Sequence, residues 1–177
     1  MSDSPDSISQ ANTVIDAFHR NIHEGFVYTT TGKQTALTNG SSVEFLIDVP
    51  ALTWPHIQSM RLNFGRGDID FVIYEGPTVS ANGSELTYQN VNRNSSNTPD
   101  LNLYSGPTTS ADGTLIYTLW IPPTGTGTGQ SGNGISDSGQ GNEWVLAPST
   151  QYLARITNNS GATIDWSYEF TWYELDF

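Results

Sequence analysis

Six acidic residues are candidates for paired-carboxylate chemistry, because two acids facing each other across a cleft are enough to hydrolyse a glycosidic bond. They are Asp68, Asp70, Glu75, Glu143, Asp165 and Glu169. Asp68 and Asp70 are also candidates to share a Ca²⁺ ion with loop carbonyls, but two carboxylates on one strand are too few to define such a site. In alternating strands, acids on the outward face are the usual case. We therefore expect solvated acids and no catalytic pair.

The histidines are the next candidates for a catalytic or metal site. His19 and His23 are four residues apart, a spacing that on a helix can place both rings on one metal ion. Glu24 follows His23, however, and a strand-like run begins at Gly25, so the H-E-x-x-H arrangement is missing. His56 has no evident Ser nucleophile or orienting Asp. The sequence therefore predicts neither a metal site nor a cofactor, and the protein is not expected to be an enzyme.

Two short motifs also point to structure more than to chemistry. Gly125, Gly127 and Gly129 suggest a phosphate-binding loop, but neither a following Lys nor a helix N-terminus is available to hold the anion. The tripeptide 66–68 reads Arg-Gly-Asp, a cell-adhesion signal that is too short to be informative. Together with Gly65 it is predicted to form a hairpin turn.

Composition excludes several classes of partner. The 177 residues carry a net charge of −12 with only six Lys and Arg, so a surface that follows a phosphate backbone is not expected and nucleic acid is excluded as a partner. No stretch approaches the roughly 20 apolar residues that span a bilayer, so a membrane is excluded as well. The chain has no Cys, which rules out disulfides and thiol nucleophiles.

Alternation of apolar and polar residues predicts β-strands over most of the chain. The clearest run is 164–172, in which Ile, Trp, Tyr, Phe and Trp alternate with Asp, Ser, Glu and Thr. Similar runs occupy 43–49, 60–64 and 69–73, and long loops are expected at 89–100 and 122–142. Eight to ten short strands without sustained helices predict an all-β protein, an antiparallel β-sandwich with a jelly roll as the preferred topology.

One ten-residue segment occurs twice. Residues 74–83 read Tyr-Glu-Gly-Pro-Thr-Val-Ser-Ala-Asn-Gly and residues 104–113 read Tyr-Ser-Gly-Pro-Thr-Thr-Ser-Ala-Asp-Gly, so seven of ten positions are identical. Gly-Pro ends a strand because Pro lacks the N–H that a central strand donates. Asn-Gly and Asp-Gly are strong turn signals. The repeat therefore predicts a strand, a corner, a turn and a second strand, performed twice.

The first residues differ from the rest. Residues 1–17 are polar and Ser- and Asp-rich, which is typical of either a disordered terminus or an arm that orders on a partner. A short helical turn around 10–18 is an alternative that needs tertiary support. We divide the chain into an N-terminal arm, 1–24, and a sandwich domain, 25–177. The predicted contacts of the arm with a partner are Ile8, Val14, Ile15 and Phe18, and the resemblance described below implies that this partner is a capsid or a neighbouring subunit.

Aromatic residues leave one competing hypothesis. Sugar-binding sandwiches present aromatic rings to pyranose faces, and Trp54, Trp120 and Tyr88 are the candidates. Trp166 and Trp172 belong instead to the apolar face of the last strand. Burial in the core or in a subunit interface is the favoured role for most of these rings.

Several of these segments together resemble a family of small structural proteins encoded among the head genes of tailed viruses. The segments are the paired repeats, the run Asn90-Val-Asn-Arg-Asn-Ser between them, Glu143-Trp-Val-Leu, Tyr152-Leu-Ala-Arg-Ile-Thr-Asn158 and the closing Trp172-Tyr173-Glu174. The resemblance covers about residues 20–175.

The resemblance implies a head decoration, or cement, protein of the virion. Such a protein is a jelly-roll-like module that sits on the outer capsid as a dimer or trimer and braces the shell. Its partners would be the major capsid protein and copies of itself. No catalytic residue is implied. A carbohydrate- or receptor-binding module of a virus tail or fibre is the alternative.

Overall fold

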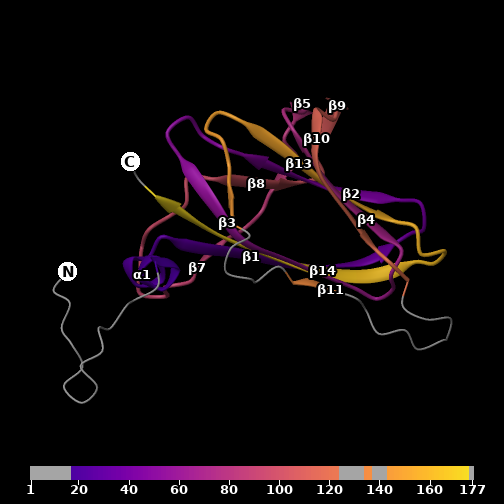
Figure 1. Ribbon diagram of the computed structural model, residues 1–177, viewed down its shortest axis with the longest axis horizontal. Helices are drawn as coiled ribbons and strands as arrows, with labels where there is room; N and C mark the ends of the chain where they lie inside the picture. The colour runs from indigo at the N-terminus through magenta and orange to yellow at the C-terminus, as the bar shows by residue number, and fades with distance from the viewer. Residues whose placement is uncertain (1–16, 124–133, 137–142, 176–177) are drawn as a thin grey trace, which may run out of the picture.

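The computed structural model describes residues 17–123, 134–136 and 143–175, and these form two packed antiparallel sheets with one short helix, α1 (Ala17–Glu24) (Figure 1). The first sheet has the order β11-β3-β14-β1-β7, and β12 also pairs with β3. The second sheet has the order β10-β4-β13-β2-β8-β6. The predicted all-β antiparallel sandwich is confirmed.

Each of the two main sheets contains six strands. The first sheet contains β1 (Val27–Leu37), β3 (Trp54–Phe64), β7 (Gln89–Asn90), β11 (Gly134–Ser136), β12 (Trp144–Val145) and β14 (Ile164–Leu175). The second contains β2 (Ser42–Asp48), β4 (Ile69–Glu75), β6 (Ser84–Glu85), β8 (Asn102–Ser105), β10 (Thr114–Ile121) and β13 (Gln151–Asn158). A separate two-stranded sheet pairs β5 (Thr78–Ala81) with β9 (Thr108–Ala111).

The core lies between the two sheets and comes from the predicted alternation. On β14, Trp166 and Trp172 are buried, and Tyr168 and Phe170 pack against the same core. Phe45 of β2 reaches across from the second sheet to within 6.0 Å of the Trp166 ring centroid and 5.0 Å of the Tyr168 ring centroid. Each strand therefore turns one side toward the core, and the inward side chains of the two sheets meet between them.

Four connections, β1 to β2, β2 to β3, β3 to β4 and β13 to β14, cross from one sheet to the other. β1, β3 and β14 belong to the first sheet, whereas β2, β4 and β13 belong to the second. The segment Gly65–Asp68 therefore joins β3 of one sheet to β4 of the other, and the predicted hairpin turn there is wrong. The strand orders are compatible with the predicted jelly roll, which stays a prediction.

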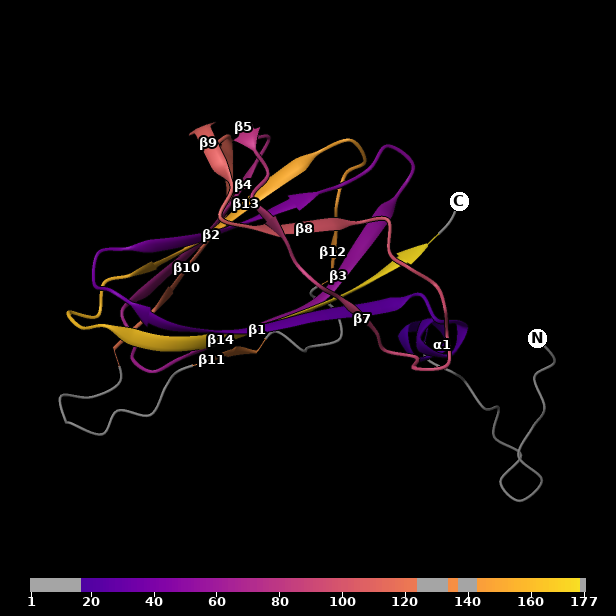
Figure 2. The same ribbon diagram turned by 180° about the vertical axis from the view of Figure 1, so that it is seen from behind.

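Two further differences from the sequence-based expectation concern element number. Fourteen strands occur in the described residues, more than the eight to ten expected, because pieces of two to four residues also pair. A helix, α1, forms over 17–24, so it overlaps only the end of the helical turn considered around 10–18, and it lies at the end of the first sheet next to β7 (Figure 2). Its Asn21 is buried and accepts the backbone N–H of Phe26 at its carbonyl oxygen. Tertiary contacts thus support a helix of only eight residues.

The repeated segment forms an interlocked strap over the second sheet. β4 and β8 lie toward opposite edges of this sheet, and β6 begins beside the end of β8 while β10 begins beside the end of β4. β5 and β9 therefore cross the outer face diagonally in opposite directions, and they pair with each other on the way, with Thr78 opposite Ala111 and Ala81 opposite Thr108. The strand that follows each copy of the repeat thus pairs with the strand that precedes the other copy, and the two copies are related by an approximate two-fold axis.

The strap covers a second, smaller apolar cluster. Leu46 and Leu153 are opposite each other on β2 and β13 and point away from the main core, yet both have no exposed surface. Pro77 and Pro107, the corner prolines of the two copies, are buried as well. The strap therefore adds a partial third layer outside the second sheet.

Candidate interaction surfaces

The six candidate acids are not brought together as a pair; each has its own structural partner. Asp68 accepts the indole N–H of Trp120 at 3.0 Å, and Asp70 accepts the side-chain amide of Asn159 at 2.8 Å. Asp165 accepts the backbone N–H of Ala36 at 3.1 Å. These partners assign the three acids to turn and strand-end contacts.

The remaining three acids behave in the same way. Glu75 accepts the Tyr152 hydroxyl at 3.0 Å, and Glu169 forms an exposed ion pair with Arg61 at 3.2 Å. Glu143 lies 3.2 Å from Nδ1 of His56. In the part of the chain that the structure describes, no three His, Asp or Glu side chains form a group able to hold a metal ion. These contacts give Glu75, Glu143 and Glu169 structural partners in neighbouring segments.

The histidines occupy two separate places. His19 and His23 lie on one side of α1, exposed, with their Nε2 atoms 2.9 Å apart. His56 stacks on Tyr173, with ring centroids 4.6 Å apart, and its buried Nε2 has no protein partner among the described residues. Nothing in these contacts supplies His56 with a nucleophile.

The predicted arm residues are placed only in part. Ile8, Val14 and Ile15 lie outside the described residues. Phe18 is on α1, half-buried, with its ring centroid 6.0 Å from that of Tyr173. The end of the predicted arm, 17–24, is therefore packed against the first sheet in the free protein.

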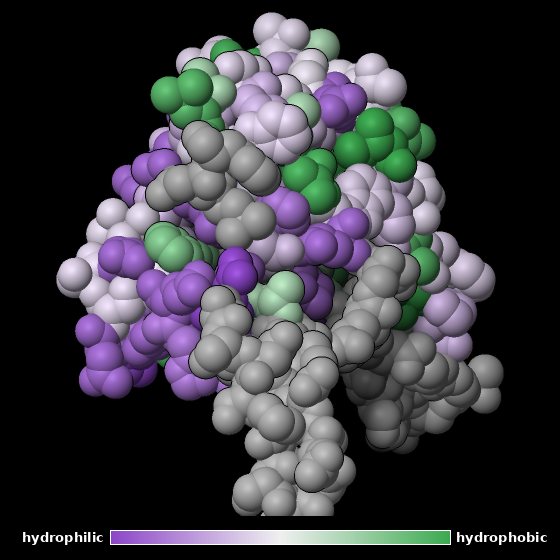
Figure 3. Space-filling model, turned by 60° about the vertical axis from the view of Figure 1, so that its left-hand side comes forward, coloured by the Kyte–Doolittle hydropathy of each residue, from purple (hydrophilic) through white to green (hydrophobic). Residues whose placement is uncertain are grey.

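Phe18 also borders a groove of about 540 Å³ on the outer face of the first sheet. Ile22 of α1 and Val91 line the same end of the groove. The floor consists of polar residues from three adjacent strands, namely Thr29, Thr31, Ser59, Arg61, Glu169 and Thr171. The groove thus combines an apolar margin with a flat, hydroxyl-rich floor. On the face of the molecule that Figure 3 shows, hydrophobic groups form small separate patches between polar ones.

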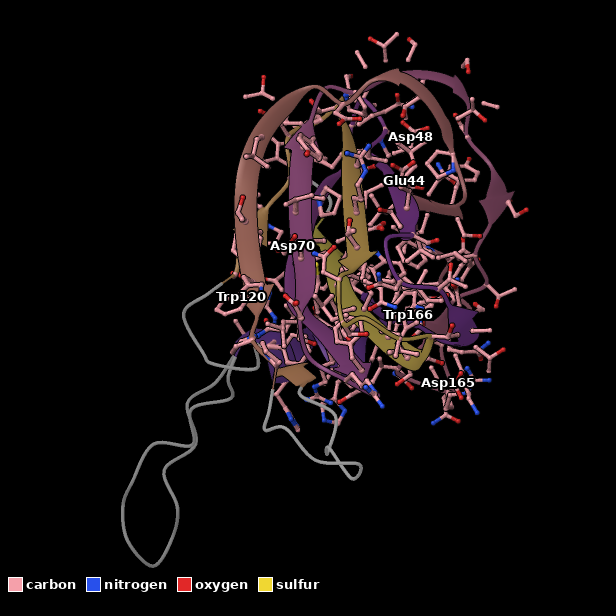
Figure 4. The ribbon with its side chains drawn as sticks, turned by 90° about the vertical axis from the view of Figure 1, so that its right-hand side faces the viewer. Glu44, Asp48, Asp70, Trp120, Asp165 and Trp166 are labelled. Atoms are coloured by element: carbon pink, nitrogen blue, oxygen red, sulfur yellow. The ribbon has the colours of Figure 1, made fainter. Side chains whose placement is uncertain are left out.

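The outer faces of the two sheets differ in charge. The first sheet presents Lys33, the single lysine, and Arg61, which pairs with Glu169. The second sheet presents acids: Glu44, Asp48 and Asp70 point outward from β2 and β4 (Figure 4). Asp165 and Glu169 of β14 lie on the same outer face as Lys33 and Arg61, so acids and bases balance there, whereas acids outnumber the single base Arg155 on the second sheet.

One cation on the acidic side holds the strap in place. Arg155 of β13 forms two hydrogen bonds with the Asp112 carboxylate in the strap turn, at 2.6 and 2.7 Å. It also bonds Glu44 at 2.6 Å and lies over the Tyr74 ring. The Arg155 guanidinium lowers the pKa of Asp112, and the two acids raise that of Arg155. This clamp was not predicted, although a lone Arg inside the apolar run 152–156 was a signal for it.

A second unpredicted polar residue is Glu174, which is buried at the end of β14. Its carboxylate accepts the backbone N–H groups of Asp100 and Leu101, at 2.7 and 3.0 Å, and the indole N–H of Trp172 at 2.9 Å. Burial raises the pKa of Glu174 in spite of these donors. The contacts tie the end of the 91–101 loop to β14, which is a structural role.

The exposed aromatic rings are fewer than the sequence suggested. Trp54 and Trp120 are 45% and 54% exposed, whereas Tyr88 packs against Tyr28 at the edge of the core. Trp166 and Trp172 are buried, as predicted. Of these five rings, Trp54 and Trp120 are the exposed ones.

The interior offers little room for a ligand. The apolar cavity between the sheets has a volume of about 50 Å³, well below the roughly 150 Å³ of a cavity that holds benzene. Among the described residues, no helix has the length and apolar character needed to cross a membrane. No protein-family model and no curated protein matches this sequence.

Proposed function

We propose that this protein is a non-enzymatic structural protein of a tailed-virus particle, which binds the outer surface of the capsid and stabilises it. The proposal joins the resemblance to head decoration proteins with one structural observation. The two outer faces of the sandwich are chemically different, and the groove that includes Phe18 lies on the less acidic one.

The first sheet is assigned to the capsid side in this proposal. Its outer face carries Lys33, Arg61 and the groove beside α1, and the segment 1–16 joins the chain at this helix. The strapped second sheet, with its outward acids, would face solvent. An acidic outer surface keeps neighbouring particles apart through charge repulsion.

Binding of many copies supplies the stabilising mechanism. A ligand that binds only the assembled shell stabilises it by mass action. When several copies are linked as one oligomer, the avidity exceeds that of a single contact by roughly 10²–10⁴. A rigid sandwich suits this role because little conformational entropy is lost when it binds.

Copy number in purified particles tests the proposal. Quantitative mass spectrometry, referenced to the major capsid protein, is expected to find hundreds of copies per particle. A handful would move the protein to a vertex, tail or fibre, and absence from the particle would refute a virion role.

A second candidate function is carbohydrate or receptor binding, favoured by the exposure of Trp54 and Trp120. Both rings are accessible enough to stack on a sugar face. This function predicts saccharide-dependent quenching of tryptophan fluorescence that is lost in Trp54→Ala or Trp120→Ala. A silent response across a broad glycan panel would argue against it.

A further inference from the structure

β10 is an exposed edge strand with an unusual composition. It pairs with β4 on one side, and no described strand pairs with its other side. Its eight residues include no charge, and Leu115 and Trp120 are 52% and 54% exposed. Figure 4 shows β10 as the outermost strand of the second sheet, with Trp120 at its margin. Long apolar edges of this kind are sites of strand pairing between molecules.

The repeat provides an internal comparison for this edge. β6 is the counterpart of β10 at the opposite edge of the second sheet, since each strand follows one copy of the repeat. β6 is only two residues long and ends with the exposed acid Glu85, so its edge has the usual protection against association. β10 has a bulge between Leu115 and Tyr117, but the strand continues regularly to Ile121. The molecule therefore protects one edge and leaves the other able to pair.

A second copy of the same strand is the occupant that fits this edge best. In an antiparallel pair around a two-fold axis, residues near the axis meet their own copies, so any charge there would face a like charge. β10 avoids this repulsion over its full length, in a protein whose net charge is −12. Pro122 and Pro123 follow at once, so the strand that can pair ends there.

We propose that two copies associate through antiparallel pairing of β10 with β10, with the two-fold axis at Thr118. This register sets Trp120 opposite the β10 bulge of the other copy, where Ile116 is 36% exposed. The two second sheets become one continuous sheet, with the strap of each copy on the outer side. The inference deepens the proposed function by naming the contact that builds the oligomer.

A charge introduced at the centre of the β10 edge tests the pairing in the purified full-length protein. Thr118→Lys places like charges at the axis, and Ser84→Lys places the same charge on the exposed β6 edge as a matched control. Sedimentation velocity across a concentration series is expected to show a dimer for the wild type and for Ser84→Lys, and a monomer for Thr118→Lys. Unchanged circular dichroism and thermal midpoints would show that both variants are folded.

Cysteine cross-linking gives an independent readout, because the chain has no native Cys. Thr118→Cys is expected to form a disulfide-linked dimer under mild oxidation, while Thr114→Cys is not, since its copies would be about eight residues of strand apart. A monomeric wild type, or a dimer that persists in Thr118→Lys, would overturn the proposal. These measurements use no virus, so they fail or succeed separately from the copy-number test.

Discussion

The interlocked strap makes a quantitative prediction at the turn glycines of the repeat. Gly83 and Gly113 both have positive φ, +94° and +90°, and a Cβ added to either would lie 2.3 Å from a carbonyl oxygen of the other copy. For Gly113 this oxygen belongs to Glu75, and for Gly83 it belongs to Ser105. The clash is with backbone, which cannot rotate away as a side chain can.

Gly76 is the matched control, because it lies in the same strap with φ +69° and has no atom within 4 Å of an added Cβ. Gly76→Ala should cost only the left-handed backbone strain, about 1–2 kcal/mol. Gly113→Ala should add an overpacking cost of about 1–3 kcal/mol, for a total near 2–5 kcal/mol. One kcal/mol corresponds to about 2–4 °C in the unfolding midpoint of a domain of this size.

Urea and thermal unfolding of the single variants and of the double variant Gly83→Ala/Gly113→Ala measure these costs. The double variant should lose less stability than the sum of the two single losses, because either substitution alone displaces the shared strap. Equal destabilisation by Gly113→Ala and Gly76→Ala would contradict this prediction, since the close approach of the Glu75 carbonyl oxygen to residue 113 would then make no contribution to the free energy of unfolding.

Three further predictions concern polar contacts and the arm. Arg155→Met removes the cation between Glu44 and Asp112 and should destabilise the protein by about 1–3 kcal/mol in urea unfolding. The pKa of Asp112 is lowered in the folded state, so the contribution of this carboxylate to stability is present above its unfolded pKa and is lost as the pH falls below that value. The difference in unfolding free energy between wild type and Arg155→Met should therefore become smaller in acid. Glu174→Leu leaves three hydrogen-bond donors without an acceptor and should lower the free energy of unfolding by about 2–5 kcal/mol. A second substitution, Glu174→Gln, tests the pH dependence. Since burial raises the pKa of Glu174, the folded state holds its proton more tightly, and the stability of the wild type relative to Glu174→Gln should decline as the pH rises above the unfolded value of 4.5. An opposite pH trend in either comparison would contradict these assignments. Deletion of 1–16, which retains α1 and Phe18, should abolish capsid binding in a co-sedimentation assay without lowering the thermal midpoint, and retained binding would remove the arm from the proposed function.

Local residue patterns are enough to predict the main strands and the corners of the strap. Strict alternation over 164–172 fixes which side chains of β14 face the core, because successive residues of a strand point to opposite sides. Gly-Pro and Asn-Gly or Asp-Gly in both copies of the repeat fix where strands end and turn, since these residues tolerate or require particular φ angles. These signals are local and therefore visible in the sequence.

Which surfaces are covered depends on long-range contacts that local patterns do not predict. Alternation predicts an outward side for Leu46 and Leu153, and it holds no information about the strap that crosses them from residues 30 or more positions away. The same reason explains Glu174 and Arg155, whose partners come from distant segments, and the crossing at Gly65–Asp68, where the flanking strands join different sheets. Burial and partnership depend on long-range contacts, so a pattern of neighbours along the chain can predict a strand but not what lies against its second face.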